Sequence, residues 1–425
     1  MSGVTVLLQS SPSAWPAPTG AQSERVNEST DLKVVAVQVG PILERHIASG
    51  YMPGAVALIG RGEHAEVVEI GRMAKENAPH MRRDSIFRIA SMTKPVTAVA
   101  TMMLIEKGRL RLDEPIERWL PELGHRRVLK RLDGPLDDTV PAKRPITIED
   151  LLTFRCGLGI IWPAADSYPI LRQIAALNLI GFGPPEPAYA LAPDEWLKRL
   201  GTLPLMAQPG ERWLYNTGSY ILGALLARAS GRSLPDLLRI GIFEPLGMND
   251  TGFFVPERAR NRLVSAYRLE AGVAELYDAP ATSLWNAAPA FPDGGAGLVS
   301  TVDDYFAFAH LLWARGRAGG RRLLSEASIA ALTTDHLTVS QRVGGASILG
   351  SGRGWGYGLS VIAARTEEGF APGSYGWNGG LGTSWMADPA SGLNAILLTQ
   401  TGFTSPVAPT VHQEFLRAVL APAFL

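Results

Sequence analysis

The pattern of apolar and polar residues in the first part of the chain predicts a helix, a hairpin, a short strand and a buried helix. Residues 33–50 place apolar side chains at helical spacing, and the runs 54–60 and 66–71 flank a glycine-containing turn, as in a β-hairpin. Residues 85–89 alternate between apolar and polar positions, as strands do. The segment 96–107 is apolar on almost every side, which is typical of a buried helix.

The remainder of the chain has helices in its middle and strands toward its end. Thr147 and Asp150 form a capping pattern at the start of a helix in 146–152. Apolar patterning predicts further helices over 218–231, 234–242, 302–312 and 411–420, and strands over 357–362, 382–387 and 393–399. We therefore expect a mixed α/β (α+β) protein, in which terminal helices cover one sheet face and the mid-chain helices form a second lobe.

This architecture divides the chain into three parts. We expect a disordered tail over residues 1–32, an α/β sheet domain built from 33–110 and 296–425, and a mostly helical domain over 111–295. A site would normally lie in the cleft between two such lobes. Residues 159–209 are rich in Pro, Trp, Tyr and Leu and only weakly periodic, so they form either a pocket-shaping insertion or a surface excursion. In the first case, Trp162 and Tyr168 would contact the substrate.

The composition describes a compact globular protein with little attraction for polyanions. Of the 425 residues, 46% are hydrophobic and 19% are charged, and the formal net charge is zero, so we expect no nucleic-acid partner. No run approaches the ~20 apolar residues of a membrane span, and residues 1–30 lack the basic and apolar regions of a signal peptide. We expect a cytoplasmic location, although the sequence leaves open a leader that was removed.

Ser91 and Lys94 are the first candidates for chemistry. They lie one helical turn apart at the predicted strand-to-helix junction, which stacks both side chains on one face. A serine hydroxyl becomes a good nucleophile when a neighbour accepts its proton, and a lysine can do so once burial lowers its pKa. The apolar residues around them offer such burial. The alternative from this motif alone is an ordinary helix start with a solvated lysine.

Other catalytic classes have weaker support in the sequence. There is no Gly-x-Ser-x-Gly, no His-Glu-x-x-His and no phosphate-binding glycine loop before a helix, and the histidines lack metal-ligand spacing. The single cysteine, Cys156, has only Arg155 beside it to stabilise a thiolate, so a structural role is expected. We expect no metal and no cofactor.

Ordered motifs from about Val34 to the C-terminus resemble the superfamily of serine β-lactamases and penicillin-binding-protein-like enzymes. Ser91-Met92-Thr93-Lys94 is similar to its first motif, and Tyr215 lies in a segment similar to its second. The other matching segments are 147–158, 291–298, 300–304 and 379–389. The resemblance implies a β-lactamase-like fold with an antiparallel sheet.

The same resemblance implies roles for individual residues. Ser91 would be acylated, Lys94 would assist its deprotonation, and Tyr215 would pass the proton to the leaving group. The oxyanion hole would consist of the main-chain N–H groups of Ser91 and Gly380. The alternative for residues 379–382 is a tight strand connection without a catalytic role.

Two departures from the family pattern favour an ester substrate. No lysine follows Lys198, so the Lys-Thr-Gly motif of penicillin-recognising members is missing, and Trp377-Asn378-Gly379 takes its place as a substrate-binding segment. This arrangement resembles the family VIII carboxylesterases. In the second motif, Asn216 is shifted by one position and Thr217 occupies the usual asparagine position.

The function expected from this resemblance is hydrolysis of short-to-medium acyl esters, with weak β-lactam hydrolysis as a side activity, so the expected partner is a small-molecule ester. The alternatives are a β-lactamase or D-alanyl peptidase, an acyltransferase, and a catalytically silent acyl-binding protein.

Overall fold

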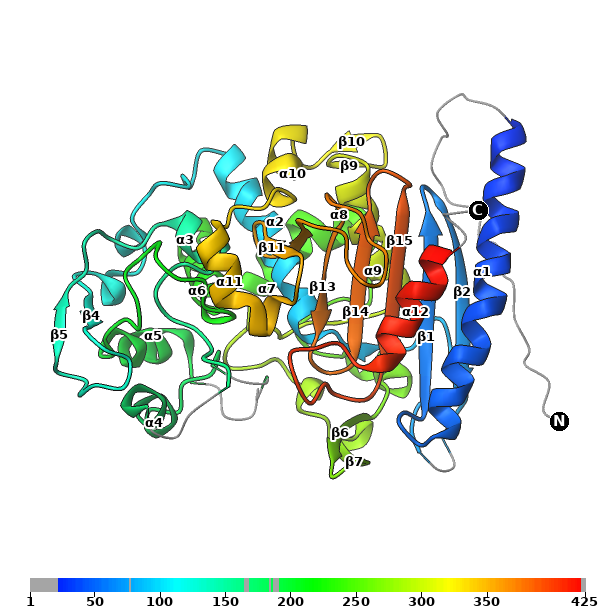
Figure 1. Ribbon diagram of the computed structural model, residues 1–425, viewed down its shortest axis with the longest axis horizontal. Coiled ribbons are helices and arrows are strands. Elements are labelled where there is room, and N and C mark those ends of the chain that lie inside the picture. Colours follow the sequence, from blue (N-terminus) through cyan, green and yellow to red (C-terminus); the bar gives the residue numbers. More distant parts are fainter. Residues whose placement is uncertain (1–21, 76–77, 164–167, 183–184, 186–190, 422–425) are drawn as a thin grey trace.

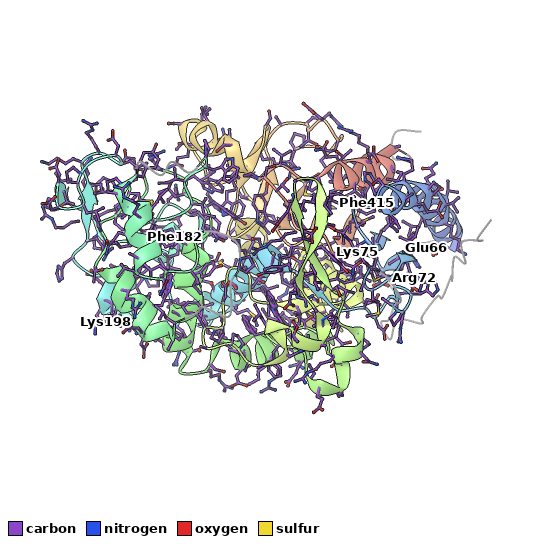
Figure 2. All side chains as sticks on the ribbon, turned by 90° about the horizontal axis from the view of Figure 1, so that it is seen from below. Glu66, Arg72, Lys75, Phe182, Lys198 and Phe415 are labelled. Carbon is purple, nitrogen blue, oxygen red and sulfur yellow. The ribbon has the colours of Figure 1, made fainter. Side chains whose placement is uncertain are left out.

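The structure is a computed structural model that describes residues 22–75, 78–163, 168–182, 185 and 191–421, with side chains from residue 31 onward. Figure 1 shows an elongated molecule with a large sheet toward one end and a group of helices at the other. In the view from below, Phe182 and Lys198 mark the helical lobe, while Glu66 and Phe415 mark the sheet end (Figure 2). The predicted two-lobed arrangement is therefore present.

The main sheet has seven strands, all antiparallel to their neighbours. In spatial order they are β11 (Arg353–Trp355), β12 (Ser360–Ile362), β13 (Tyr375–Gly379), β14 (Thr383–Asp388), β15 (Leu393–Thr399), β1 (Gly54–Arg61) and β2 (His64–Gly71). The predicted hairpin at 54–71 is confirmed, and it joins the C-terminal strands because β1 pairs with β15.

Alternate residues of the two central strands enter different hydrophobic cores, since neighbouring side chains of a strand point to opposite faces. On β1, Ala57 and Ile59 join the core beneath the terminal helices, whereas Val56 and Leu58 join the larger core on the opposite face. Strand β15 alternates in the same way. A strand buried on both faces is apolar throughout, which explains the continuous hydrophobic runs in the sequence.

Helices cover both faces of the sheet. Helix α1 (Gln22–Ala48) and helix α12 (Thr410–Leu420) pack against each other and on one face, as predicted (Figure 1). Helices α2 (Thr93–Glu106) and α9 (Val302–Trp313) contribute to the core on the opposite face. The remaining helices are α3 (Ile148–Leu152), α4 (Pro169–Ala176), α5 (Pro193–Gly201), α6 (Thr217–Ser230), α7 (Leu234–Leu238), α8 (Glu244–Leu246), α10 (Glu326–Leu332) and α11 (Val339–Leu349).

Short two-stranded pairs complete the fold. They are β3 (Phe87–Arg88) with β8 (Val299–Ser300), β4 (Arg127–Leu129) with β5 (Thr139–Pro141), β6 (Ala266–Glu270) with β7 (Val273–Asp278), and β9 (Arg317–Ala318) with β10 (Arg321–Arg322). The strand expected over 85–89 is the two-residue β3, and it lies outside the main sheet.

The N-terminal helix begins earlier than the sequence pattern indicated. Helix α1 starts at Gln22, so the prediction of a disordered tail over 1–32 is wrong for residues 22–32, which are helical. This segment contains neither glycine nor proline, and its polar residues tolerate a helix without an apolar face. Residues 1–21 of that tail lie outside the described residues.

Candidate active site

Ser91 lies in a sharp turn between β3 and α2. A single 3₁₀ turn, Ala90–Met92, connects the two elements, and Ala90 has a φ of +42°. A left-handed residue with a Cβ costs roughly 1–2 kcal/mol, so the surroundings must hold this turn in place. The Tyr305 hydroxyl donates to the carbonyl of Met92 over 3.0 Å, and the Leu298 N–H donates to Thr93 Oγ1 over 3.2 Å. The two middle residues of the motif thus anchor the turn, while Ser91 stays partly exposed.

Lys94 is completely buried behind Ser91. Its Nζ lies 2.8 Å from Ser91 Oγ and 2.8 Å from the carbonyl oxygen of Gly295. Burial lowers the Lys94 pKa to about 7, against a smaller opposing effect of the Asp293 carboxylate. Relative to a free lysine, that shift disfavours the charged form by roughly 5 kcal/mol. A large fraction of Lys94 is therefore the free amine at neutral pH, with a lone pair available to Ser91.

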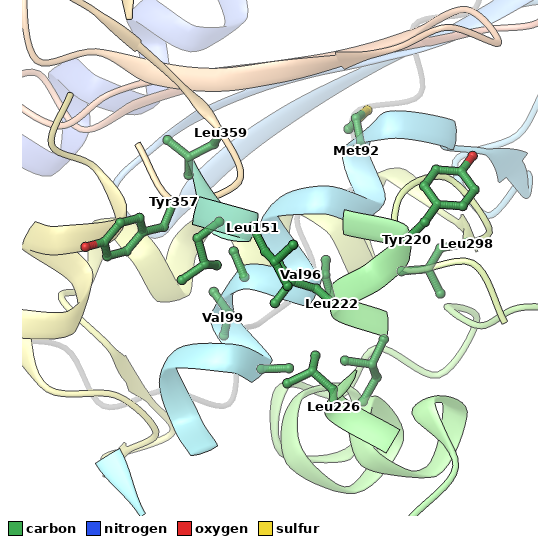
Figure 3. Close-up of a cluster of buried hydrophobic side chains, with 14 of the residues drawn as sticks. Met92, Val96, Val99, Leu151, Tyr220, Leu222, Leu226, Leu298, Tyr357 and Leu359 are labelled. Atoms are coloured by element: carbon green, nitrogen blue, oxygen red, sulfur yellow. The ribbon is translucent and has the colours of Figure 1, made fainter. Parts of the chain in front are cut away.

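A hydrophobic cluster at the junction of the two lobes surrounds helix α2, which carries Lys94. Met92, Val96 and Val99 come from the motif turn and α2, and they pack with Leu151 of α3 and Leu222 of α6 (Figure 3). Helix α3 begins at the predicted capping box, in which Thr147 and Asp150 each bind the other's main-chain N–H. The lysine thus lies inside the core of the protein.

Tyr215 reaches the same point from the helical lobe. Lys94 Nζ lies 4.7 Å from the centroid of the Tyr215 ring, and the Ser91 side chain lies close enough to the phenol to act on its pKa. Burial raises the Tyr215 pKa well above its usual value, although the contacts with Ser91 and Trp377 oppose this effect. The phenol is therefore neutral at neutral pH, and Lys94 is the better base of the two.

The residues after Tyr215 attach the helical lobe to the 159–209 insertion. Asn216 adopts a φ of +88° at the start of α6. Its Nδ2 donates to the carbonyl of Gly181 over 3.1 Å, and Thr217 Oγ1 donates to the same oxygen over 2.9 Å. Both side chains are therefore hydrogen-bonded to the insertion. In this chain, the altered residues of the second motif bind the main chain of the insertion.

Trp377 lies on β13 and contacts Tyr215 directly. Its indole N–H donates to the Tyr215 oxygen over 2.7 Å, and the side chain is only 7% exposed. Trp377 belongs to a compact aromatic cluster with Phe154, Trp213 and Trp355. The tryptophan that takes the place of the missing lysine therefore directs its polar edge at the phenol.

The β13–β14 connection brings main-chain N–H groups toward the motif turn. A Cβ on Gly379 would come within 2.2 Å of the Ile89 carbonyl oxygen, so only glycine allows β13 to lie this close. Gly380 is exposed, and a Cβ there would meet nothing within 4 Å. Within the described part of the chain, neither the Ser91 N–H nor the Gly380 N–H donates to a main-chain acceptor.

The other residues predicted to contact the substrate, Asn378, Trp162 and Tyr168, differ in how exposed they are. Asn378 is partly buried on β13 opposite Ser384. Trp162 is 46% exposed, and its segment passes close to Tyr215, because Ile160 N–H donates to the Tyr215 carbonyl over 2.9 Å. Tyr168 packs against the large core at the start of α4.

Two site features were not assigned a role from the sequence. The Gly295 carbonyl accepts a hydrogen bond from Lys94, and Asp293 binds the loop that presents it. The only sequence signal was a lone acidic residue within the apolar, glycine-rich segment 291–298. The hydrogen bond between Trp377 and Tyr215 had no sequence signal, because it joins residues far apart in the chain.

Among the described residues, no group of three or more His, Cys, Asp or Glu side chains is placed to hold a metal ion. Cys156 is buried, and burial raises its pKa to about 12, which agrees with a structural role. No helix within the described ranges has the length and apolar character needed to cross a membrane.

Known proteins resemble this chain over most of its length. It is 40% identical over 362 residues to an uncharacterised protein of Mycobacterium tuberculosis, covering 83% of this chain and 86% of that protein. Esterase EstB of Burkholderia gladioli is 30% identical over 413 residues, which is 92% of this chain and 97% of EstB. The solved structure of EstCE1, described as a hydrolase with promiscuous acyltransferase activity, has a TM-score of 0.76 at 26% identity and covers 92% of this chain and 99% of its own.

These similarities confirm the predicted superfamily and its β-lactamase-like fold, and they include the esterase branch. The family model described as Beta-lactamase matches residues 41–416, which contain the Ser91 turn, Tyr215 and Trp377. The chain belongs to the Beta-lactamase family.

Proposed function

We propose that the protein is a carboxylic ester hydrolase that cleaves short-to-medium acyl esters through an acyl-enzyme on Ser91. The observation that carries this proposal is the convergence of Ser91, Lys94 and Tyr215, with the Trp377 indole where a carboxylate-binding cation would otherwise lie. A neutral indole offers no charge to a penicillin carboxylate, whereas an uncharged ester needs none. The esterase relative EstB supports the same substrate class.

Acylation begins with proton transfer from Ser91 to Lys94. The free amine of Lys94 keeps one N–H on the Gly295 carbonyl and receives the Ser91 proton on its lone pair, as Oγ attacks the ester carbonyl. The oxyanion that forms would be bound by the N–H groups of Ser91 and Gly380, which donate to no main-chain acceptor among the described residues.

The leaving alcohol takes its proton from Tyr215. The phenol gives its proton to the departing alkoxide, and the newly charged Lys94 beside the ring returns a proton to the phenolate. In the second half of the reaction, water attacks the carbonyl of the acyl-enzyme and Lys94 accepts the water proton. Lys94 then passes this proton to Ser91 Oγ as the acid product leaves. Trp377 stabilises negative charge on the phenol oxygen through its N–H.

A Ser91→Ala substitution tests the mechanism. We expect hydrolysis of p-nitrophenyl butyrate to fall by at least about 10³-fold, because the nucleophile is lost. Intact mass after treatment with a fluorophosphonate should show one adduct in the wild type and none in the variant. Retained hydrolysis in the variant would contradict the mechanism, and absence of an adduct in the wild type would favour a silent binding protein.

Acyl transfer is a second candidate because EstCE1, the structural neighbour, is described as having promiscuous acyltransferase activity. Adding an alcohol acceptor to the ester assay and measuring the new ester distinguishes transfer from hydrolysis. Turnover of a chromogenic cephalosporin, compared with that of the ester, tests the β-lactamase alternative, and we expect the ester to be preferred. The cytoplasmic location stays a prediction that cell fractionation can check.

A further inference from the structure

The loop that faces Lys94 is held by a buried carboxylate with no part in the steps above. Asp293 Oδ1 accepts the N–H groups of Gly295 over 2.6 Å and Ala296 over 3.1 Å. The same loop directs the Gly295 carbonyl at Lys94 Nζ over 2.8 Å. Asp293 therefore determines where the acceptor of the lysine lies.

This loop has little room to move. A Cβ on Gly295 would come within 2.5 Å of the Tyr220 ring, and one on Gly294 within 2.8 Å of the Ser219 carbonyl oxygen. Thr97 Oγ1 of α2 also donates to the Gly294 carbonyl over 2.7 Å. The loop is thus packed between α2 and α6, with Asp293 at one end and the lysine at the other.

Asp293 and Lys94 influence each other without an ion pair between their described atoms. Asp293 is 7% exposed, and burial raises its pKa to about 6, although Lys94 and the two N–H groups oppose the shift. In return, the ionised carboxylate raises the pKa of Lys94. Within the described residues, the other titratable groups that influence the pair are the phenols of Tyr215, which precedes α6, and Tyr220, which is buried within α6.

We propose that Asp293 is a positioning residue, which holds the Gly295 carbonyl against Lys94 and whose charge sets how readily Lys94 gives up its proton. This inference rests on the proposed role of Lys94 as the base for Ser91. An ionised Asp293 keeps Lys94 protonated to higher pH, and a neutral Asp293 releases the free amine at lower pH. The two groups therefore titrate as a coupled pair.

Replacing Asp293 by asparagine separates its two roles. The amide oxygen can still accept the N–H groups of Gly295 and Ala296, but the charge is gone. In the wild type, we expect the acid limb of the pH profile of kcat/KM for p-nitrophenyl butyrate to lie near pH 7. In Asp293→Asn, this limb should move to a lower pH by about one unit. In Asp293→Ala, which also lacks the acceptor, kcat should fall by a further tenfold or so, since the Gly295 carbonyl is no longer held.

Asp304→Asn is the matched control. Asp304, at the start of α9, is another largely buried carboxylate whose pKa burial raises to about 6. It accepts hydrogen bonds from the Asp250 N–H and the Thr251 hydroxyl and not from the Gly295 loop. We expect its acid limb to coincide with that of the wild type. An unshifted limb in Asp293→Asn, or an equal shift in Asp304→Asn, would overturn the inference.

A second measurement needs neither a folded variant at Asp293 nor esterase activity. The chain has seven lysines, so the ¹³Cε signals of labelled lysine are few, and the signal lost in Lys94→Met belongs to Lys94. We expect Lys94 to titrate in two coupled steps in the wild type, and a single simple titration would contradict the inference. If the Ser91→Ala variant keeps its activity, the proposed function fails; if Ser91 is essential but Lys94 titrates alone, only this inference fails.

Discussion

The indole N–H of Trp377 and the phenol oxygen of Tyr215 are joined by a 2.7 Å hydrogen bond that links the main sheet to the helical lobe. In the penicillin-recognising proteins that the sequence resembles, a cationic side chain occupies the place of Trp377. A neutral donor can stabilise developing negative charge on the phenol, but it cannot bind the carboxylate of a substrate. Under the proposed function, the tryptophan would therefore keep the proton transfer through Tyr215 and favour an uncharged substrate.

Trp377→Phe should lower kcat for ester hydrolysis by about tenfold, because the phenol oxygen loses a hydrogen bond worth about 1 kcal/mol or more. Trp213→Phe is the matched control. Trp213 stacks on Tyr215 in the same cluster, but its buried indole nitrogen has no hydrogen-bond partner within the described structure. Steady-state kinetics of both variants distinguish loss of the hydrogen bond from loss of packing. Equal losses of kcat in the two variants would show that packing alone matters.

Lys94→Met should make the protein more stable and less active. The folded state lowers the Lys94 pKa to about 7, so unfolding takes up a proton between about pH 7 and the ordinary lysine pKa, and wild-type stability rises with pH across that window. Methionine removes this cost but leaves the Gly295 carbonyl without its donor, so we expect a net gain of about 2 kcal/mol at pH 7.

Urea unfolding at pH 7 and near pH 10 measures that gain, which should be largely gone at the higher pH. Activity in the same variant should fall by about 10³-fold or more, since no base remains beside Ser91. A variant that is less stable than the wild type at pH 7 would show that burial of Lys94 carries little energetic cost.

The buried His412, which lies outside the candidate active site, should make the stability of the protein fall in acid. It is fully buried on α12, and its Nδ1 lies 2.8 Å from Ser384 Oγ of β14. Burial lowers the His412 pKa to about 3, so the native state keeps it neutral while the unfolded chain binds a proton below about pH 6.5. Stability should therefore fall as the pH drops through this window, by up to about 1.4 kcal/mol per pH unit.

In His412→Asn, the amide oxygen can replace Nδ1. Urea unfolding of this variant should show a smaller loss of stability between pH 6.5 and pH 4 than the wild type does. The exposed His64 provides the control, since His64→Asn removes a histidine without changing a buried contact. An unchanged slope in His412→Asn would mean that His412 is protonated in the native state.

The sequence predicted the local elements of the site well. The Ser91 turn, the capping box at Thr147 and the β1–β2 hairpin depend on residues close together in the chain, so their patterns are visible in a single sequence. The start of α1 was placed too late because residues 22–32 have no apolar periodicity to indicate a helix.

The contacts that complete the site were beyond a single sequence. The apolar pattern did not predict strand β13, since Tyr375–Gly379 contains two glycines and lacks a clear alternation, and only the resemblance placed Trp377-Asn378-Gly379 on a strand. The resemblance identified Trp377-Asn378-Gly379 as a substrate-binding segment, but the contact of Trp377 with Tyr215 and the position of Asp293 depend on how distant segments pack. The position of β1 beside β15 likewise depends on pairing between residues far apart in sequence.

That pairing has a consequence for the growing polypeptide on the ribosome. Ser91, Lys94 and Tyr215 all emerge before β13, β14 and β15 have been synthesised, so β1 first exists with an open edge toward its missing neighbour. Until the C-terminal strands arrive, nothing supplies the Trp377 donor or the Gly380 N–H. A nascent or truncated chain would thus carry the nucleophile without its supporting groups, and reactivity toward an acyl probe would report that translation has passed the last strand.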